Sequence, residues 1–292
     1  MKLIPTGIEN FKELIDKDYY YVDKTNLIVN IINEKVVLYT RPRRFGKTLN
    51  MSMLYYFFSI KEKENAYLFD GLNISKNKEA LKHQNNYPMI FISLKDMKNS
   101  TFEEQIASFQ DIIKNVVLQN KELLESIYVD KSDKLILQDF RFSNSSLDQL
   151  KYALKTISRC LYNHYHQKVI ILIDEYDVPL QSAYQYNYYD EMVEFLRNVF
   201  SSALKTNESL EKGIMTGCLR ISKESIFTGL NNFKAYSILY KSKNEYFGFT
   251  EKETLQLLED YNLTDYIDEV KEWYDGYLFG NIEIYNPWST LM

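Results

Sequence analysis

The chain has 292 residues, and its composition excludes several broad classes of protein. Only nine residues are glycine and five are proline, whereas 25 are tyrosine and 17 are phenylalanine, so this is neither a collagen-like array nor a disordered low-complexity segment. The formal net charge of −5 argues against a surface built as a whole for nucleic acid or an anionic membrane. With two cysteines and no long apolar run, we expect a soluble cytoplasmic protein without a membrane partner.

Short apolar runs without alternation recur along the chain, and such runs are typical of strands that are buried on both faces. The expected strands are residues 36–40, 89–94, 169–173 and 213–216. Helical spacing of apolar residues is found at residues 47–60, about 102–127, 147–165 and 189–204. This alternation predicts an α/β domain with a central, mostly parallel sheet that is flanked by helices.

Two regions depart from this alternation. Residues 130–146 are polar and weakly patterned, and we expect a long loop or an insertion there. From about residue 246, where Thr250 and the acids after it look like a helix N-terminus, we expect a small helical subdomain. The predicted division is therefore a core of residues 1–245 and a C-terminal helical lid of residues 246–292.

A phosphate-binding motif of the Walker A kind follows the first expected strand. Residues 40–48 read Thr-Arg-Pro-Arg-Arg-Phe-Gly-Lys-Thr and precede an amphipathic helix, so backbone N–H groups and the helix dipole can face a polyphosphate. Lys47 can reach the β- and γ-phosphates, and Thr48 can place a hydroxyl on Mg²⁺. Arg41 occupies the position of the usual first glycine, so a corner whose basic side chains are merely solvated is the alternative. The basic residues of this segment favour a polyphosphate partner over nucleic acid.

The third expected strand ends in two adjacent carboxylates, as in a Walker B motif. Asp174 is placed to hold Mg²⁺, and Glu175 to orient and polarise the attacking water. Acids that only cap a strand end are the alternative. Because ligands of open α/β sheets bind at the carboxyl ends of strands, this motif and the preceding one reinforce each other. Asp177, slightly further on, is expected to cap the next helix, and the alternative is an acid that supports the site by contacting the residues that bind the ligand.

Three residues at the end of the fourth expected strand complete the candidate site. The Thr216 hydroxyl is placed to hydrogen-bond the γ-phosphate or the attacking water. Arg220 can reach the phosphates in cis or a neighbouring subunit's nucleotide in trans, and a structural ion pair is its alternative role. Cys218 is most simply a small apolar filler.

Strings beyond these motifs make the chain similar to a known family. It resembles the AAA-ATPase-like domain of many bacterial proteins, which often precedes a PD-(D/E)XK-type nuclease domain. The strings are residues 4–11, 21–25, 41–49, 172–177, 216–221, 223–232, 246–250, 273–277 and 285–288. The family's phosphate loop has this form, so the resemblance implies that Arg41 at the first-glycine position is a family feature.

The resemblance implies a P-loop fold of the additional-strand type, with a C-terminal helical lid and with ATP and Mg²⁺ as ligands. The implied phosphate-binding residues are Arg44, Phe45, Gly46, Lys47, Thr48 and Leu49. Tyr21 and Val22 lie where related ATPases build part of the base-binding wall, and Asp23 is expected to be the N-cap of the helix that follows. No Asp followed by Glu-x-Lys occurs beyond the expected lid, so we do not expect nuclease activity.

These observations predict an ATP-binding and Mg²⁺-dependent ATP-hydrolysing protein that couples its nucleotide state to a conformational change. The alternative is a nucleotide-gated regulatory module with little turnover, which acts on a partner such as a separately encoded nuclease or a nucleic acid. A DNA-binding accessory protein is a third hypothesis. Trp273 and Trp288 are expected in the lid core, and any part of that core left exposed would favour a homo-oligomer.

Overall fold

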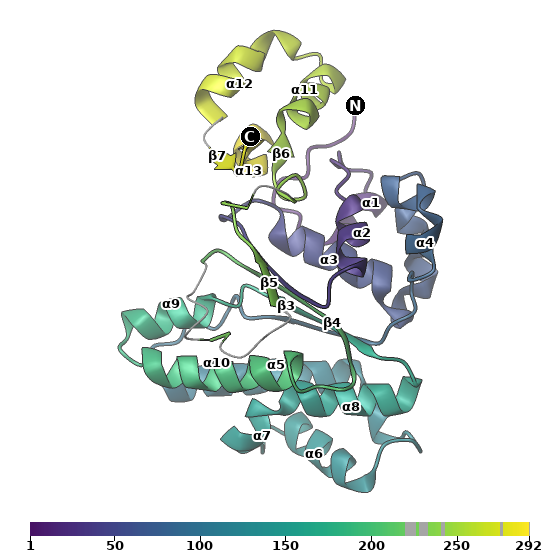
Figure 1. Cartoon of the computed structure of the whole chain (residues 1–292), viewed down its shortest axis with the longest axis vertical. Coiled ribbons are helices and arrows are strands. Elements are labelled where there is room, and N and C mark those ends of the chain that lie inside the picture. The colour runs from purple at the N-terminus through teal and green to yellow at the C-terminus, as the bar shows by residue number, and fades with distance from the viewer. Residues whose placement is uncertain (220–225, 228–232, 241–242, 275–276, 292) are drawn as a thin grey trace.

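The computed structural model describes residues 1–219, 226–227, 233–240, 243–274 and 277–291. A five-stranded sheet with every strand parallel forms its centre (Figure 1). The strands are β1 (Val36–Thr40), β2 (Met89–Ser93), β3 (Val169–Asp174), β4 (Leu210–Gly217) and β5 (Phe233–Tyr236). Their order is β2-β3-β4-β1-β5, so the ends of β3, β4 and β1 are neighbours.

The sheet confirms the four predicted strands and adds a fifth. Strand β5 was not predicted, because its four residues Phe-Lys-Ala-Tyr include an exposed lysine and form no continuous apolar run. It lies at the edge of the sheet and pairs only with β1. A short edge strand has one side without a neighbouring strand, so it does not need a continuous apolar sequence.

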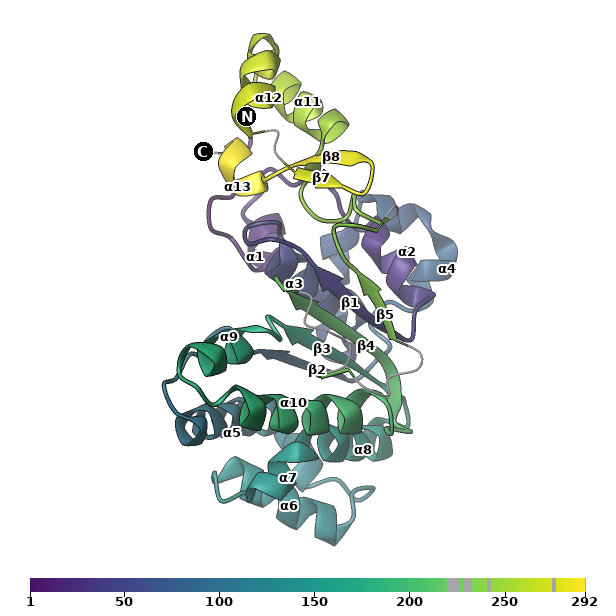
Figure 2. The same ribbon diagram turned by 60° about the vertical axis from the view of Figure 1, so that its left-hand side comes forward.

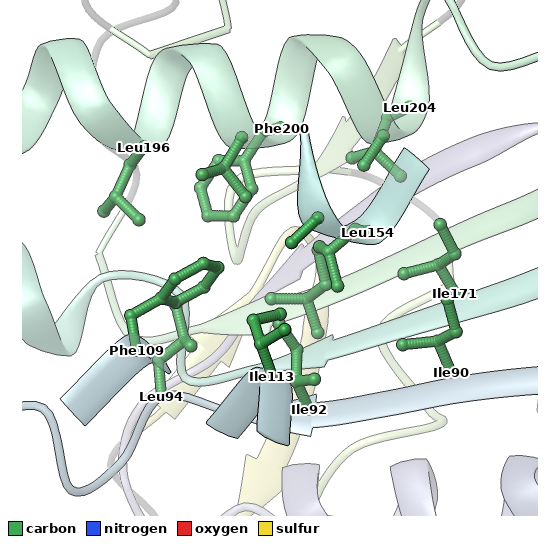
Figure 3. Packing of buried hydrophobic residues seen from close by; sticks show 14 of the residues in the cluster. Ile90, Ile92, Leu94, Phe109, Ile113, Leu154, Ile171, Leu196, Phe200 and Leu204 are labelled. Carbon is green, nitrogen blue, oxygen red and sulfur yellow. The ribbon is translucent and has the colours of Figure 1, made fainter. Parts of the chain in front are cut away.

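Three long helices cover one face of the sheet and build the larger hydrophobic core. They are α5 (Phe102–Gln119), α8 (Ala153–Tyr165) and α10 (Tyr189–Leu204). In Figure 3, Leu196, Phe200 and Leu204 project from α10 toward the strands that carry Ile92 and Ile171, and all five are buried. The short helix α9 (Val178–Gln185) follows β3 directly.

Residues 130–146, which were expected to be a long loop or an insertion, are mainly helical, so the prediction of a loop is wrong and the prediction of an insertion is not tested. Helix α6 (Lys131–Arg141) and helix α7 (Leu147–Lys151) form an outer layer against the three long helices (Figure 2). Only a narrow stripe of α6 is apolar and buried, with Leu137 and Phe140 at its centre, and the polar majority conceals that stripe in the sequence.

The other face of the sheet carries the N-terminal helices and the helix that follows β1. They are α1 (Phe11–Asp16), α2 (Asn26–Ile32), α3 (Lys47–Phe58) and α4 (Lys78–Leu81), with 3₁₀ helices at Ile60–Phe69 and Asn73–Lys76. Helix α3 packs against β3 and buries Met53, Leu54, Phe57 and Phe58. The helix predicted for residues 47–60 is thus confirmed to within two residues at its end.

The C-terminal part is not purely helical, which corrects a second prediction. A three-stranded antiparallel sheet is formed by β6 (Phe249–Thr250), β8 (Ile282–Tyr285) and β7 (Tyr277–Phe279), in that order. Helices α11 (Glu251–Asp260), α12 (Ile267–Tyr274) and α13 (Pro287–Leu291) accompany it. These strands are too short to stand out in the sequence, and they pair because Phe279 and Ile284 are buried against the core.

Two further features of this part bear on the predictions. Trp273 is 77% exposed, so its expected place in a core is wrong. The N-terminus lies beside α11, where the Tyr261 hydroxyl donates to the Lys2 carbonyl oxygen at 2.6 Å and that of Tyr20 to Asp260 at 2.6 Å (Figure 1). Within the described residues, no helix combines the length and apolar character needed to cross a bilayer.

Candidate functional site

The loop that joins β1 to α3, residues 41–46, turns through two left-handed positions. Arg44 has φ of 70° and Gly46 has φ of 75°. A Cβ atom on Gly46 would meet no atom within 4 Å, so glycine is favoured here for its backbone freedom and not for lack of space. Gly46 is also the N-cap of α3, so the free N–H groups of that helix begin at this loop. The loop therefore presents amide donors at the carboxyl end of β1.

The ammonium group of Lys47 is held against this loop. Its Nζ lies 2.9 Å from the carbonyl oxygen of Pro42, 3.1 Å from that of Arg41 and 3.3 Å from Sγ of Cys218. The side chain is buried, and Cys218 is half-buried. The Cys218 thiol is thus a polar neighbour of Lys47, so its interpretation as an apolar filler is incomplete.

Arg41 does not face the site, which corrects the expectation that it adds positive charge for a polyphosphate. Its side chain is fully buried and points toward β5 and the chain that follows β5. The guanidinium donates to the carbonyl oxygens of Tyr236 at 2.6 Å and Thr40 at 2.9 Å, and to Oδ1 of Asn244 at 3.0 Å. Burial lowers the pKa of Arg41 to about 10. The positive charge of Arg41 is therefore directed at carbonyl and amide oxygens of the protein and not at a phosphate.

Aromatic rings complete the surroundings of Arg41. Its Cζ lies 5.2 Å from the ring centroid of Phe247 and 5.5 Å from that of Phe279 in β7. Phe45 packs on the same strand, with its ring centroid 5.2 Å from that of Phe279. Two side chains of the β1–α3 loop therefore anchor it to the C-terminal part, and at Phe45 only the backbone is left to meet a ligand.

Glu34, which precedes β1, binds residues that surround Arg41. Glu34 is 6% exposed and accepts hydrogen bonds from Lys234 at 2.8 Å, Lys243 at 2.9 Å and the Tyr236 hydroxyl at 2.7 Å. Burial alone would raise the pKa of Glu34, but these hydrogen bonds outweigh burial and lower it to about 2, from an ordinary value of 4.5.

A depressed carboxyl pKa contributes stability above the unfolded value and loses it as the pH falls through the folded value. We expect Glu34→Gln to lower the free energy of unfolding at pH 7 by about 2 kcal/mol, and the wild type to lose this advantage between pH 4.5 and pH 2. Urea denaturation across that range measures both effects. Glu79→Gln, which changes an exposed carboxylate, is the control. An equal pH dependence in wild type and Glu34→Gln would contradict the prediction.

The predicted acidic strand end lies directly beside the β1–α3 loop. Asp174 is fully buried, and its Oδ2 accepts a hydrogen bond from the Thr48 hydroxyl at 2.7 Å. Its Oδ1 accepts from the Thr216 hydroxyl and from the Glu175 amide at 3.1 Å. The strand order β3-β4-β1 explains the convergence, because neighbouring parallel strands bring their carboxyl ends to one edge of the sheet.

Glu175 is half-buried and has the left-handed φ of 52°. Burial and the charge of Asp174 raise the pKa of the Glu175 carboxyl, against the opposing effects of Lys47 and Lys98. A carboxylate with a raised pKa is a better proton acceptor than a free one. The acid is therefore suited to general-base chemistry, with a basic side chain nearby.

Asp177 occupies the N-cap position of α9, yet its side chain makes no capping hydrogen bond. The carboxylate instead accepts from the backbone N–H of Leu219 at 2.9 Å and of Cys218 at 3.1 Å. The prediction that Asp177 caps the helix is therefore wrong, because the chain after β4 offers its amides to the same carboxylate. Arg220 lies outside the described residues.

A cavity of about 420 Å³ opens beside the loop. Its lining includes Gly46, Lys47, Thr48, Leu49 and Glu175, the predicted wall residues Tyr21 and Val22, and Phe249 and Trp288 of the C-terminal part. Arg44 also lines it, and its Cζ lies 4.6 Å from the ring centroid of Trp288. Most of the predicted site residues that the structure describes thus line one cavity, whereas Asp174 and Thr216 do not line it, and Asp174 adjoins it through its hydrogen bond with Thr48.

The segment before α2, residues 21–25, differs from the prediction at Asp23 and forms an ion pair that the sequence did not predict. Asp23 is not the N-cap of α2, because Thr25 is, and the Asp23 carboxylate accepts from the Thr25 amide and hydroxyl. Lys24 is buried and forms an ion pair of 2.6 Å with Glu253 of α11. The capping box of Thr250 and Glu253 is visible in the sequence, but nothing local indicates a partner 229 residues away.

Residues 5–227 match the family model that is described as "Predicted AAA-ATPase". The chain belongs to the AAA-ATPase-like family. It is similar to an uncharacterized protein in the vnfD 5′ region of Azotobacter chroococcum mcd 1, with 26% identity over 299 residues that cover 100% of this chain and 51% of the relative. The chain therefore spans about half the length of that curated relative.

The residues of the site fit a magnesium ion bound together with a nucleotide. Asp174 and Thr48 offer a carboxylate and a hydroxyl oxygen that already share a hydrogen bond, and hard cations prefer oxygen donors. Among the described residues, no group of three or more His, Cys, Asp or Glu side chains could hold a metal ion. This donor set suits Mg²⁺, which keeps waters and takes phosphate oxygens in addition to one or two protein ligands.

Proposed function

We propose that this chain binds ATP with Mg²⁺ and hydrolyses it in the cavity beside the β1–α3 loop. The observation that carries the proposal is the contact of the buried Asp174 with the hydroxyls of Thr48 and Thr216, next to Lys47. The carboxyl ends of β3 and β4 supply Asp174 and Thr216, and the start of α3, after β1, supplies Lys47 and Thr48, at the edge of the sheet where ligands of open α/β sheets bind. Strand β4 stands between β1 and β3, and this order supports a P-loop fold of the additional-strand type.

In this proposal each group of the site has one task. Lys47 and the backbone amides of residues 44–49 hold the phosphates, since amide donors and a helix N-terminus favour anions. Thr48 and Asp174 hold Mg²⁺, which when bound neutralises charge on the β- and γ-phosphates. Glu175 accepts the proton of the attacking water, and the Thr216 hydroxyl reads the γ-phosphate. Arg220 stays a proposed phosphate ligand, in cis or in trans.

The base and the lid are assigned from the cavity lining. In this proposal Tyr21, Val22 and Trp288, which line the cavity, contact the nucleobase, and residues 246–292 act as a lid on a core of residues 1–245. The Lys24–Glu253 ion pair and the contact of Arg44 with Trp288 tie this lid to the wall and to the loop. Nucleotide binding between them would thus be coupled to the position of the lid.

Calorimetry with Mg-ATP tests the binding step. We expect Lys47→Ala to weaken binding about tenfold or more, because it removes the charge that is held at the loop. Lys131→Ala is the matched control, since Lys131 is the exposed first residue of α6 as Lys47 is the first residue of α3. Equal affinity of Lys47→Ala and wild type would contradict the assignment, and the absence of nucleotide binding in the wild type would exclude the whole proposal.

A second candidate function is a nucleotide-gated module with little turnover, which acts on a partner protein such as a nuclease or on nucleic acid. Arg41 favours this candidate, because its buried guanidinium connects the loop to the chain leading into the C-terminal part. Binding of Mg-ATP without turnover would support it. The exposed Trp273 and Leu278 are consistent with a homo-oligomer or a partner surface, which stays a proposal.

A further inference from the structure

Tyr176 and Asp177, which follow Glu175, form hydrogen bonds with the main chain that follows β4. Asp177 is 0% exposed, and its carboxylate binds the N–H groups of Cys218 and Leu219 and Nε2 of Gln181. The Tyr176 hydroxyl donates to the Leu219 carbonyl oxygen at 2.6 Å. Both polar groups of the Leu219 backbone are thus bound by the acidic segment.

The two segments fit together too closely for a side chain between them. A Cβ atom on Gly217 would lie 2.5 Å from a ring carbon of Tyr176 and 2.6 Å from Oδ1 of Asp177. Hydrogen bonds continue on both sides, from the Tyr176 amide to the Thr216 carbonyl oxygen at 3.1 Å and from the Arg41 amide to that of Gly217 at 3.0 Å. The end of β4 is therefore joined both to the acidic segment and to the β1–α3 loop.

Glu175 lies inside this network in a strained conformation. A left-handed φ is unfavourable for a residue other than glycine, and it persists where the surroundings enforce it. Here the Glu175 amide is bound by Asp174, and the next two residues are bound to the chain after β4. The contacts of Tyr176 and Asp177 thus supply the constraint that the strained backbone needs.

We propose that Asp177 is a positioning residue that holds Glu175 in its left-handed conformation by accepting hydrogen bonds from the backbone N–H groups of residues 218–219. The same hydrogen bonds fix the position of Cys218, whose thiol contacts the ammonium group of Lys47. The inference rests on the proposed function, because it assigns Asp177 a role in the orientation of the water-activating carboxylate. It gives a task to a fully buried carboxylate, whose charge the backbone N–H groups of Cys218 and Leu219 stabilise.

A double-mutant cycle in the full chain tests this role. Asp177→Asn keeps the side-chain size but leaves one oxygen for two amides, and we expect kcat to fall about 10- to 100-fold while the affinity for Mg-ATP is unchanged. In a Glu175→Gln background the same change is expected to add little, because the carboxylate that it positions is absent. Asp148→Asn, at an exposed acid in the first turn of α7, is the control. Equal factors in both backgrounds would overturn the proposal.

Thiol labelling tests the hydrogen bonds between Asp177 and residues 218–219 without any measurement of turnover. Its result therefore does not depend on whether the proposed function is correct. Cys160 is fully buried and Cys218 is half-buried, so iodoacetamide reports mainly on Cys218. We expect Asp177→Asn to be labelled several-fold faster than wild type at Cys218, and Tyr176→Phe, which removes one hydroxyl, to show a smaller rise. Equal labelling in wild type and both variants overturns the proposal even if ATP is hydrolysed. Faster labelling of the variants, together with no ATP turnover in the wild type, would support the role of Asp177 in holding residues 218–219 and would reject only the proposed function.

Discussion

Replacing Glu175 with glutamine is expected to lower ATP turnover by about 10²- to 10³-fold while leaving Mg-ATP binding intact. The amide has the size of the carboxylate but cannot accept a proton from the attacking water. The proposed phosphate and metal ligands Lys47, Thr48 and Asp174 are left in place, so we expect the affinity for Mg-ATP to be unchanged. Phosphate release gives the turnover, and calorimetry gives the affinity of the same samples.

The pH profile gives a second measurement of the same carboxylate. Burial and the charge of Asp174 raise the Glu175 pKa above the ordinary value of 4.5. Because a general base acts when deprotonated, wild-type turnover is expected to fall with decreasing pH, with a midpoint above 4.5. Glu103→Gln, at an exposed acid in the first turn of α5, is expected to behave as wild type. Turnover by Glu175→Gln at the wild-type rate would exclude this residue as the base.

Replacing Arg41 with glycine is expected to lower the free energy of unfolding by about 3–5 kcal/mol, although it restores the first glycine of the usual phosphate-binding motif. The guanidinium is fully buried, and its loss leaves the carbonyl oxygens of Thr40 and Tyr236 and Oδ1 of Asn244 without this donor. Packing with Phe247 and Phe279 is lost as well. Urea denaturation measures the difference.

Two further variants separate the roles of charge and shape at this position. Arg41→Lys keeps a cation but loses the planar fork of donors, so we expect an intermediate loss of stability. Arg43→Gly changes an exposed arginine of the same loop and is expected to cost about 1 kcal/mol or less. An Arg41→Gly variant as stable as Arg43→Gly would contradict the buried role of Arg41.

The features that could be predicted from the sequence are those with a local pattern. Continuous apolar runs identify β1, β2, β3 and β4, and helical periodicity identifies α10 with both of its ends. The basic loop after β1 and the acids after β3 each follow a buried strand, so the parallel sheet that was predicted already implies that they share an edge. Local patterns thus account for the fold class and for most of the candidate site.

The remaining features depend on contacts between distant parts of the chain. Arg41 looks like a phosphate ligand in the sequence, but its partner Tyr236 lies 195 residues away and draws it into the core. Asp177 looks like a helix cap, but amides 41 and 42 residues further on take its carboxylate. Strand β5 and the pair β7–β8 lack a local signal, because each forms only when another strand supplies its hydrogen bonds. The sequence by itself determined which residues gather at the sheet edge. The tertiary structure decided which of them face the cavity, because a buried polar group takes the nearest partner in space and not in sequence.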